Sequence, residues 1–370
     1  MLKCLTQLEE KKMIIINGYP LATDSASGIH RNTIELLKEL DKIVDKNYIQ
    51  LLVPHDIDKS FHFQNIEVVK LHAHKRSKLL RGRTYIWNHF TVGRYAKKNK
   101  AISLDTLLSF APPKLDIVMV YDCIPEQFPE QYVGLKTKIW IHLFLKSQAK
   151  ALKKAKLVLT DSYHAKADIE KYYPQSKGKI KVVPCGWQHM NSIKEDDTIL
   201  ERLNISRGNY FFTLGSRLLH KNVRWIAAAA KQNPNETFVV TGAFKKQYDG
   251  GEELDNVIYT GYLKDEEIKS LCRHCKAFIH PSKYEGFGIP PMEAMSVGAR
   301  CIVSTGGSLP EVYGNSVWYI DPYKYDNIDF KEIMSKKIDD NQIILDKYSW
   351  EKSASLLKQY LDEYIKLYNA

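Results

Sequence analysis

The chain has 370 residues, 44% of them apolar, and a formal net charge of +11. This length and apolar content allow two domains to bury separate cores without disulfides or metals. No run of about 18 uncharged apolar residues occurs, so we expect no transmembrane helix. The leader at 1–12 lacks the apolar core of a signal peptide, and we therefore expect a cytoplasmic protein.

Short apolar runs alternate with helical patterns along the whole chain. In the first half, Ile29, Leu36 and Leu40 recur at helical spacing. Parallel strands joined by helical crossovers form doubly wound α/β sheets, which is the fold class we predict. The runs that predict buried strands lie at 13–17, 49–53, 66–71, 117–121, 157–160 and 180–183.

A polar stretch at about 188–205 predicts a linker, after which a second α/β series begins. Its predicted helices lie at 221–231, 265–275 and 291–297, and an amphipathic helix follows at 350–368. We predict one domain at 1–192, a second at 193–350 and a terminal helix at 351–370. The predicted strands of the second series lie at 210–214, 237–241, 257–259, 277–280, 301–304 and 317–320.

The six cysteines are scattered, and only Cys272 and Cys275 have the spacing of a metal-binding pair. A structural zinc site would need a second ligand pair at a suitable spacing. We therefore expect reduced thiols, no metal and no cofactor. The other cysteines are Cys4, Cys123, Cys185 and Cys301.

The basic excess lies entirely in the first half. Residues 1–192 hold 31 Lys and Arg against 18 Asp and Glu. Residues 71–100 carry nine basic residues and no acid, and residues 136–156 carry seven lysines, no acid and interleaved apolar residues. Such a face attracts anionic lipid or nucleic acid, and a plain solvated surface is the alternative. No nucleic-acid-binding motif accompanies the charge, so of these two partners we favour a membrane surface, and the plain solvated surface stays open.

The most informative segment, at 280–298, reads HPSKYEGFGIPPMEAMSVG. A strand ends at His280, a glycine-bearing loop follows, and two prolines open a helix. Gly286 and Gly288 let the backbone approach a ligand closely, and the N-terminus of the new helix favours a phosphate.

Two carboxylates, Glu285 and Glu293, frame this loop. A carboxylate can accept hydrogen bonds from two neighbouring hydroxyls, and a sugar ring and a ribose each carry such a diol. Charged hydrogen bonds contribute about 1.5–3 kcal/mol each, enough to select a polyol ligand. The alternative is that Glu293 only complements the helix dipole while Glu285 is solvated.

A second group of residues precedes this loop in the same half. A strand ends at Gly215, a loop carries Arg217 and Lys221, and a helix begins near Asn222. Cations at a helix N-terminus can stabilise a departing nucleoside diphosphate without a metal. Two ordinary loop cations are the alternative.

The run EGFGIPPMEAM, with two glutamates eight positions apart, resembles retaining glycosyltransferases of family 4. The continuation through 298–314 to Asp321 and Pro322 is also similar to this family. The resemblance covers about Met13 to Tyr360; it is strong after residue 210 and diffuse before residue 115. It implies the GT-B fold, in which two Rossmann-like domains face each other across a cleft. It also implies that the terminal helix crosses back to the first domain.

The resemblance further implies roles for individual residues. Glu293 would bind the ribose diol, Glu285 would bind hydroxyls of the donor sugar, and Arg217 and Lys221 would stabilise the leaving diphosphate. The backbone N–H groups at 287–289 would face the sugar and diphosphate. The implied donor-binding set is Gly28, Gly215, Arg217, Lys221, Glu285, Gly286, Phe287, Gly288, Ile289 and Glu293.

The first half carries weaker matches. Gly28 stands where a family glycine packs against the donor phosphates, and we expect Arg31 to be a surface residue of the following helix. Tyr121 and Asp122 stand where the family has a His-Asp pair. Tyrosine can hydrogen-bond but does not titrate near neutral pH, so the role of Tyr121 stays open. Asp122 would position a hydroxyl and joins Arg217, Lys221 and Glu285 as a catalytic candidate, with a strand-end cap as the alternative.

Together these features predict a retaining, metal-independent hexosyltransferase with its donor site in the second domain. We favour GDP-mannose over a UDP-sugar, and a glycan or lipid-linked acceptor of surface polysaccharide synthesis at the inner face of a membrane. The alternatives are a sugar-nucleotide epimerase on the same fold and a non-catalytic basic binding module. A dehydrogenase is disfavoured because no GxGxxG follows the first strand.

Overall fold

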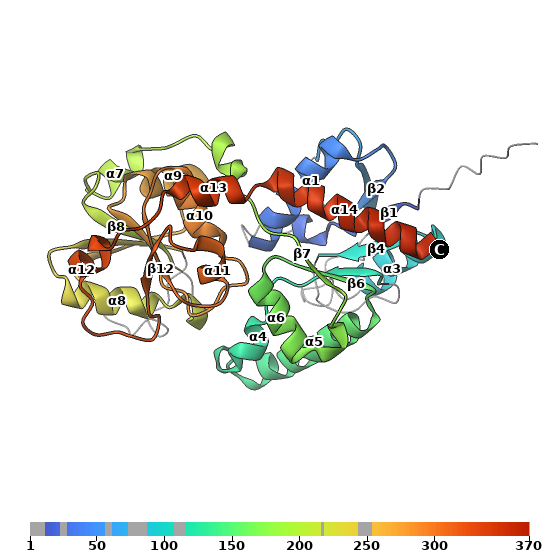
Figure 1. The fold of residues 1–370 in the computed structure, drawn as a ribbon, viewed down its shortest axis with the longest axis horizontal. Helices are drawn as coiled ribbons and strands as arrows, with labels where there is room; N and C mark the ends of the chain where they lie inside the picture. Colours follow the sequence, from blue (N-terminus) through green and yellow to red (C-terminus); the bar gives the residue numbers. More distant parts are fainter. Residues whose placement is uncertain are drawn as a thin grey trace, which may run out of the picture.

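The computed structural model describes residues 12–22, 28–55, 61–72, 87–106, 115–215, 218–242 and 254–369. These residues form two lobes that lie side by side, each built on one parallel sheet (Figure 1). Residues 1–11 of the predicted leader, which include Cys4, and residues 73–86 of the first basic run lie outside the described residues.

The first sheet has seven parallel strands in the order β3-β2-β1-β4-β5-β6-β7. Most strands are apolar and buried throughout, as parallel sheets covered on both faces require. The strands are β1 (Ile14–Asn17), β2 (Ile49–Pro54), β3 (Glu67–Leu71), β4 (Ile102–Asp105), β5 (Ile117–Met119), β6 (Leu157–Thr160) and β7 (Ile180–Val182).

Strand β4 was not among the predicted strands. Its sequence, ISLD, alternates apolar and polar residues although the strand is buried in the middle of the sheet. The polar side chains find partners there: Ser103 Oγ donates to Asp116 at 3.2 Å, and Asn17 donates to Asp105 at 2.9 Å. Hydrogen bonding thus permits a buried strand that hydrophobicity alone does not reveal.

The second sheet has six parallel strands in the order β10-β9-β8-β11-β12-β13. Every strand predicted in this half is confirmed to within two residues. Together with the first sheet, this arrangement confirms the predicted pair of doubly wound α/β domains. The strands are β8 (Tyr210–Leu214), β9 (Thr237–Thr241), β10 (Val257–Gly261), β11 (Ala277–His280), β12 (Cys301–Ser304) and β13 (Trp318–Ile320).

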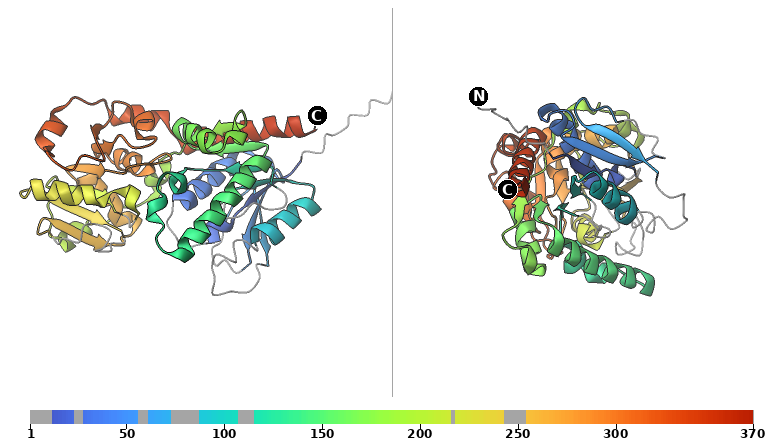
Figure 2. Two further views of the ribbon diagram at one scale, coloured as in Figure 1. Left: turned by 90° about the horizontal axis from the view of Figure 1, so that it is seen from below. Right: turned by 90° about the vertical axis from the view of Figure 1, so that its right-hand side faces the viewer.

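Helices join the strands and cover both faces of each sheet (Figure 2). In the first lobe these are α1 (Gly28–Ile43), α3 (Gly93–Lys98), α4 (Ile124–Gln127), α5 (Leu135–Lys154) and α6 (Tyr163–Tyr172), with a π-helical turn at Trp87–Val92. The remaining helices are α7 (Thr198–Arg202), α8 (Val223–Gln232), α9 (Asp265–His274), α10 (Ile289–Ser296), α11 (Leu309–Tyr313), α12 (Phe330–Ser335), α13 (Asn341–Lys347) and α14 (Trp350–Asn369). Short 3-10 turns lie at Tyr19–Ala22, Pro129–Gln131, Pro174–Ser176, Gln188–Ser192 and Leu219–Lys221.

Two of these assignments correct the sequence predictions. The predicted linker at 188–205 contains a 3-10 turn and α7, which packs on α9. Helix α10 begins at Ile289, two residues before the predicted start, because Gly288 adopts the left-handed conformation that caps it. None of the described helices combines the length and the apolarity that crossing a membrane requires.

The chain passes between the lobes twice, and the second passage ends in α14. This helix leaves the lobe of the second sheet and runs along α1 of the first lobe (Figure 1). The hydroxyl of Tyr48, the residue directly before β2, donates a hydrogen bond to Asp362 of α14 at 2.6 Å. Buried residues of α14, including Trp350 and Leu361, belong to a core that continues through both lobes. The boundaries at 192 and 350 stay a prediction.

Each sheet has a point where its strand order reverses, between β1 and β4 and between β8 and β11. In open parallel sheets, ligands bind beyond the carboxyl ends of the strands at this point. The loops that follow β8 and β11 carry Gly215 and the segment 281–288, so the fold places both predicted groups of residues at one edge of the second sheet.

Candidate functional site

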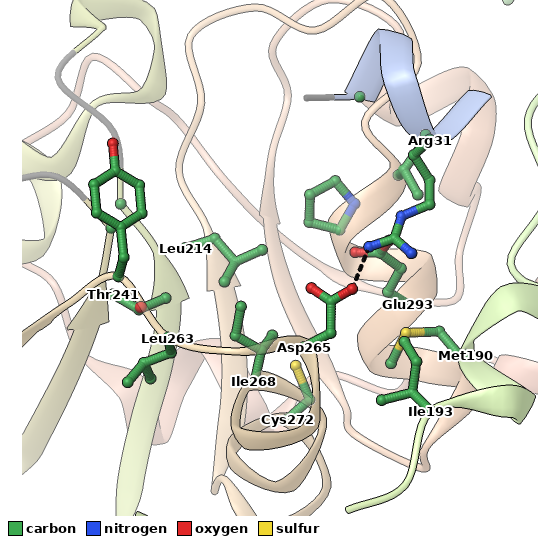
Figure 3. Close-up of a pocket in the computed structure, with 16 residues that line it drawn as sticks. Arg31, Met190, Ile193, Leu214, Thr241, Leu263, Asp265, Ile268, Cys272 and Glu293 are labelled. Atoms are coloured by element: carbon green, nitrogen blue, oxygen red, sulfur yellow. Dashed lines mark hydrogen bonds and ion pairs between the residues drawn. The ribbon is translucent and has the colours of Figure 1, made fainter. Parts of the chain in front are cut away.

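Two cavities lie between the lobes, and Gly28, Ile289 and Pro290 line both. We call the first the α9 cavity; it has a volume of about 300 Å³ and is lined by residues including Leu214, Leu263, Asp265, Ile268 and Glu293 (Figure 3). We call the second the β5 cavity; it has a volume of about 450 Å³ and is lined by residues including Tyr121, Asp122, Asp161, Lys221 and Glu285.

Glu285 lines the β5 cavity, and two side chains of the second lobe hold its carboxylate in place. Lys221 Nζ lies 2.7 Å from its Oε1 and 2.9 Å from its Oε2, and His280 Nε2 lies 2.9 Å from Oε1. Burial alone would raise the pKa of Glu285, but Lys221 and His280 outweigh it and hold the pKa well below its usual range. Glu285 is therefore an ionised hydrogen-bond acceptor at neutral pH.

Sequence reasoning assigned Lys221 and Glu285 to different parts of a ligand, and the structure brings them together. It also adds His280, the last residue of β11, as a partner of Glu285. The signal for His280 was present in the sequence as a histidine at a strand end, five positions before the glutamate.

The loop at 285–288 contacts the first lobe directly. A Cβ atom on Gly286 would lie 2.1 Å from the carbonyl oxygen of Tyr121, so only glycine allows this approach. Ser162 Oγ donates to the carbonyl oxygen of Gly286 at 2.5 Å. Within the described part of the chain, the N–H groups of residues 287–289 donate to no other group, so they can donate to a ligand.

Glu293 lies on α10 and faces the α9 cavity, with its carboxylate 2.8 Å from His189 Nε2. Trp350 Nε1 donates to His189 Nδ1 at 3.1 Å. Because Nδ1 accepts this hydrogen bond, the Nε2 atom carries the proton that is donated to Glu293. Glu293 is the fifth residue of α10, beyond its first turn, so the alternative that it only complements the helix dipole is wrong.

Arg31 corrects a further expectation. The sequence suggested a helix-surface residue, but Arg31 points from α1 into the α9 cavity (Figure 3). Its Nη2 atom lies 2.6 Å from Oδ2 of Asp265, the first residue of α9. This ion pair joins the two lobes across the cavity.

Asp122 and Tyr121 follow β5 and line the β5 cavity. Asp122 Oδ1 accepts from the Ile124 N–H at 3.0 Å, so the side chain caps the strand end and also faces the cavity. Burial and the charge of Glu285 raise the pKa of Asp122, while Lys221 opposes them. The Tyr121 hydroxyl donates to Asn32 Oδ1 at 3.3 Å, and burial raises its pKa, so it remains a phenol.

His220 stands beside Lys221 on the wall of the β5 cavity. Burial and the charge of Lys221 lower its pKa to about 4. Its Nδ1 atom lies 3.3 Å from Oε1 of Gln131 in the first lobe. His220 is therefore a neutral hydrogen-bonding group rather than an acid near neutral pH.

Each predicted site residue that the structure describes lines one cavity or both. Gly28 is the first residue of α1 and lines both cavities; among the described residues outside its own helix, no atom lies within 4 Å of the position that its Cβ would take. Gly215 follows β8 and lines the α9 cavity. Arg217 lies outside the described residues.

One group of potential metal ligands, Glu195, Asp197 and His274, occurs among the residues that the structure describes. It lies outside both cavities, and its carboxylates are paired: Glu195 with Arg273 at 2.7 Å and Asp197 with Arg207 at 2.6 Å. These cations already neutralise the carboxylates.

The sequence matches one protein-family model over part of its length and individual proteins over most of it. The family model of the glycosyl transferases group 1 matches residues 195–348. The O-antigen chain mannosyltransferase RfbU of Salmonella typhimurium is 26% identical over 311 residues, covering 80% of this chain and 84% of that protein. The O-antigen chain mannosyltransferase B of Escherichia coli is 27% identical over 344 residues, covering 84% and 86%.

Solved structures share the fold. Sucrose-phosphate synthase from Thermosynechococcus elongatus superimposes with a TM-score of 0.72 at 14% identity, covering 95% of this chain and 98% of that one. Anabaena HepE, in complex with UDP and glucose, gives 0.65 at 16% identity, with 95% and 100% covered. WaaG, a glycosyltransferase involved in lipopolysaccharide biosynthesis, gives 0.63 at 15% identity, with 92% and 94% covered. These similarities confirm the GT-B fold.

Proposed function

We propose that this chain, which belongs to the glycosyl transferases group 1, transfers mannose from GDP-mannose, with retention of anomeric configuration and without a metal. That the chain is a glycosyltransferase follows from its family. The donor, the stereochemical course and the acceptor are our proposals.

The observation that carries the proposal is the pair of cavities that share Gly28, Ile289 and Pro290 as lining residues. The α9 cavity offers apolar walls at Leu214, Leu263 and Ile268 for a nucleobase, and Glu293 for the ribose diol. The β5 cavity offers Glu285 as an ionised acceptor for sugar hydroxyls. Because the N-terminus of α10 lines both cavities, a diphosphate placed there would join a nucleoside in one to a sugar in the other.

The names of the relatives favour mannose as the transferred sugar. Two proteins named as O-antigen chain mannosyltransferases each match at least 80% of this chain. A UDP-sugar is the second choice, because a neighbour with the same fold was solved with UDP and glucose. The identity to that neighbour is 16%, so it supports the fold of the donor site more than its selectivity.

In the proposed reaction, the bond between the donor's anomeric carbon and its phosphate oxygen breaks. The bond from that carbon to the acceptor oxygen forms on the same face. The departing diphosphate takes the acceptor's proton, and Lys221 with Arg217 stabilises the negative charge that develops. Lys221 is already on the cavity wall, where it pairs with Glu285. We assign no side-chain nucleophile.

We further propose that the enzyme works on a lipid-linked acceptor at an anionic membrane surface. Helix α5 exposes Leu135, Ile139 and Leu143 at four-residue spacing, which places them on one face. Exposed Lys136, Lys138 and Lys146 flank this face. Apolar residues beside lysines are the composition of helices that lie on anionic membranes. We call these six residues the α5 face.

A donor panel tests the proposed activity. The purified protein is incubated with GDP-mannose, UDP-glucose and UDP-N-acetylglucosamine, with and without EDTA, and the release of free nucleoside diphosphate is measured. We expect slow release from GDP-mannose that EDTA does not change. Selective release from a UDP-sugar would replace the donor but keep the reaction. Conversion of the sugar without release of the diphosphate would indicate an epimerase instead.

A further inference from the structure

Asp161 is a buried acid that the proposed reaction does not yet use. It directly follows β6 and is 4% exposed. It lines the β5 cavity, as does Asp122, which follows the neighbouring strand β5. Two acidic side chains from adjacent strand ends therefore lie on the wall of this cavity, at the sheet edge where ligands bind.

One oxygen of Asp161 lacks a protein partner. Among the described residues, no group donates a hydrogen bond to its Oδ1 atom. Two other buried aspartates of the first lobe are bonded: Asp168 accepts from Tyr284 at 2.7 Å, and Asp41 accepts from backbone N–H groups at 2.7–2.8 Å. Buried polar atoms are normally paired, so an unpaired oxygen of a residue that lines a cavity points to a partner supplied by a ligand.

Burial alone does not make such an oxygen a binding group. Glu126 of α4 also has a buried oxygen without a partner among the described residues, but it lines neither cavity. Its other oxygen accepts from Gln148 at 3.0 Å. The location of Asp161 on the cavity wall is thus the deciding observation, and Glu126 provides a matched control.

The surroundings of Asp161 favour its protonated form. Burial and the negative charge of Asp122 raise its pKa well above the usual range, and Glu311 and Glu285 of the second lobe add to this, while a hydrogen bond from its own backbone N–H opposes it. Two further titratable neighbours, Tyr121 and Cys185, have raised pKa values and are neutral. A protonated carboxyl can donate one hydrogen bond and accept another, as a sugar hydroxyl also can.

We propose that Asp161 binds a hydroxyl of a pyranose ring in the β5 cavity, from the first-lobe side of the cavity that Glu285 lines from the second lobe. This inference rests on the proposed function, because it requires a sugar in that cavity. The hydroxyl belongs either to the donor hexose or to the accepting sugar. Glu285 then acts as an ionised acceptor and Asp161 as a combined donor and acceptor, so the two acids recognise different hydroxyls.

The test compares the wild type with Asp161→Ala, Asp161→Asn and the control Glu126→Gln. Two activities are measured over the pH range in which the wild type and the variants stay folded: hydrolysis of GDP-mannose alone, and transfer to methyl α-mannoside. UDP-glucose is run in parallel as the second donor. We expect Asp161→Ala to lower kcat/KM roughly 10- to 100-fold at pH 7, because a ligand hydroxyl loses its partner.

Asp161→Asn should retain most activity, because an amide also donates and accepts. As the pH rises through the raised pKa of Asp161, the wild type should lose activity while the Asn variant does not. Glu126→Gln should follow the wild-type profile. A loss in hydrolysis assigns the hydroxyl to the donor hexose, and a loss in transfer alone assigns it to the acceptor.

The inference is overturned if Asp161→Ala matches the wild type in both reactions. It is also overturned if Asp161→Asn loses as much as Ala, or if it declines at high pH together with the wild type. If the wild type itself neither turns over nor binds either donor, the proposed function fails, and this inference fails with it. Normal turnover with unaffected Asp161 variants would contradict this inference alone.

Discussion

His189 Nε2 lies 2.8 Å from Glu293 Oε1, and His189 Nδ1 accepts a hydrogen bond from the indole of Trp350. His189 lies where the chain first passes between the lobes, and Trp350 begins α14 after the second passage. The two passages are therefore hydrogen-bonded to each other and to the carboxylate that we propose for the ribose. His189 is a positioning residue for Glu293.

We predict that His189→Ala weakens the binding of GDP about 3- to 10-fold, since a hydrogen bond of this kind contributes about 1 kcal/mol. Trp350→Phe, which removes the indole donor together with part of a buried ring, should show a smaller loss in the same direction. Isothermal titration calorimetry with GDP measures both. Unchanged GDP affinity in His189→Ala, with an unchanged melting temperature, would contradict the positioning role.

Glu285 is buried and Lys221 is partly buried, so removing the lysine should be costly. We predict that Lys221→Met lowers the free energy of unfolding by about 1.5–3 kcal/mol, because the buried carboxylate of Glu285 loses its charged hydrogen bonds to Lys221 and keeps only His280 as a partner. Combining it with Glu285→Gln should recover part of that loss. Urea unfolding of the two single variants and the double variant measures the coupling, and strictly additive effects would show that the pair does not interact.

The same pair predicts a pH dependence of stability. The folded-state pKa of Glu285 is held below its unfolded value, so the carboxylate contributes stability above about pH 4.3, the usual pKa of Glu. That contribution is lost as the pH falls through the folded-state pKa. Melting temperatures of the wild type should therefore fall more steeply below about pH 4.3 than those of Glu285→Gln. If the melting temperatures of the two proteins fell equally with pH, the lowered pKa of Glu285 would be contradicted.

Gly286 allows the second lobe to touch the first at the carbonyl of Tyr121. We predict that Gly286→Ala prevents this approach and lowers kcat by at least about 100-fold, since closure positions the reacting groups. GDP binding to the α9 cavity should change little, because that cavity is not lined by Gly286. The radius of gyration of the variant, measured by X-ray scattering, should be larger than that of the wild type. If Gly286→Ala were as active as the wild type, the contact would be dispensable.

The α5 face predicts binding to anionic vesicles that depends on both charge and apolar contact. The variant Leu135→Glu/Ile139→Glu should lose most vesicle binding at low salt. The control Ile343→Glu changes an equally exposed isoleucine of α13 in the second lobe and should bind as the wild type does. Sedimentation with phosphatidylglycerol vesicles measures this. Binding of the wild type to neutral vesicles at the same level would contradict the electrostatic component.

The features that sequence could predict are those encoded within one short segment. The glutamates at 285 and 293, the glycines between them and the flanking strand and helix lie within about twenty residues, so a local pattern carries them. Strands β8 to β13 are short apolar runs and were predicted for the same reason. Strand β4 was missed because its buried polar residues depend on partners elsewhere in the chain.

The features that sequence could not predict depend on how the two lobes pack. His189 meets Glu293 across 104 positions, and Arg31 meets Asp265 across 234. Neither pair has a local pattern, because each forms only when segments far apart in the sequence pack together. The cavity-facing position of Asp161 likewise follows from the adjacency of β5 and β6 together with the approach of the second lobe.

The central claim is that Glu285 binds the hexose of a nucleotide-sugar whose transfer retains anomeric configuration. The most direct measurement follows GDP-mannose and methyl α-mannoside by NMR with the wild type and Glu285→Gln. We predict an α-linked product from the wild type and a roughly 100-fold or greater loss of kcat/KM in the variant, because charged hydrogen bonds to the sugar are removed. A β-linked product, or equal rates for the two proteins, would contradict the account.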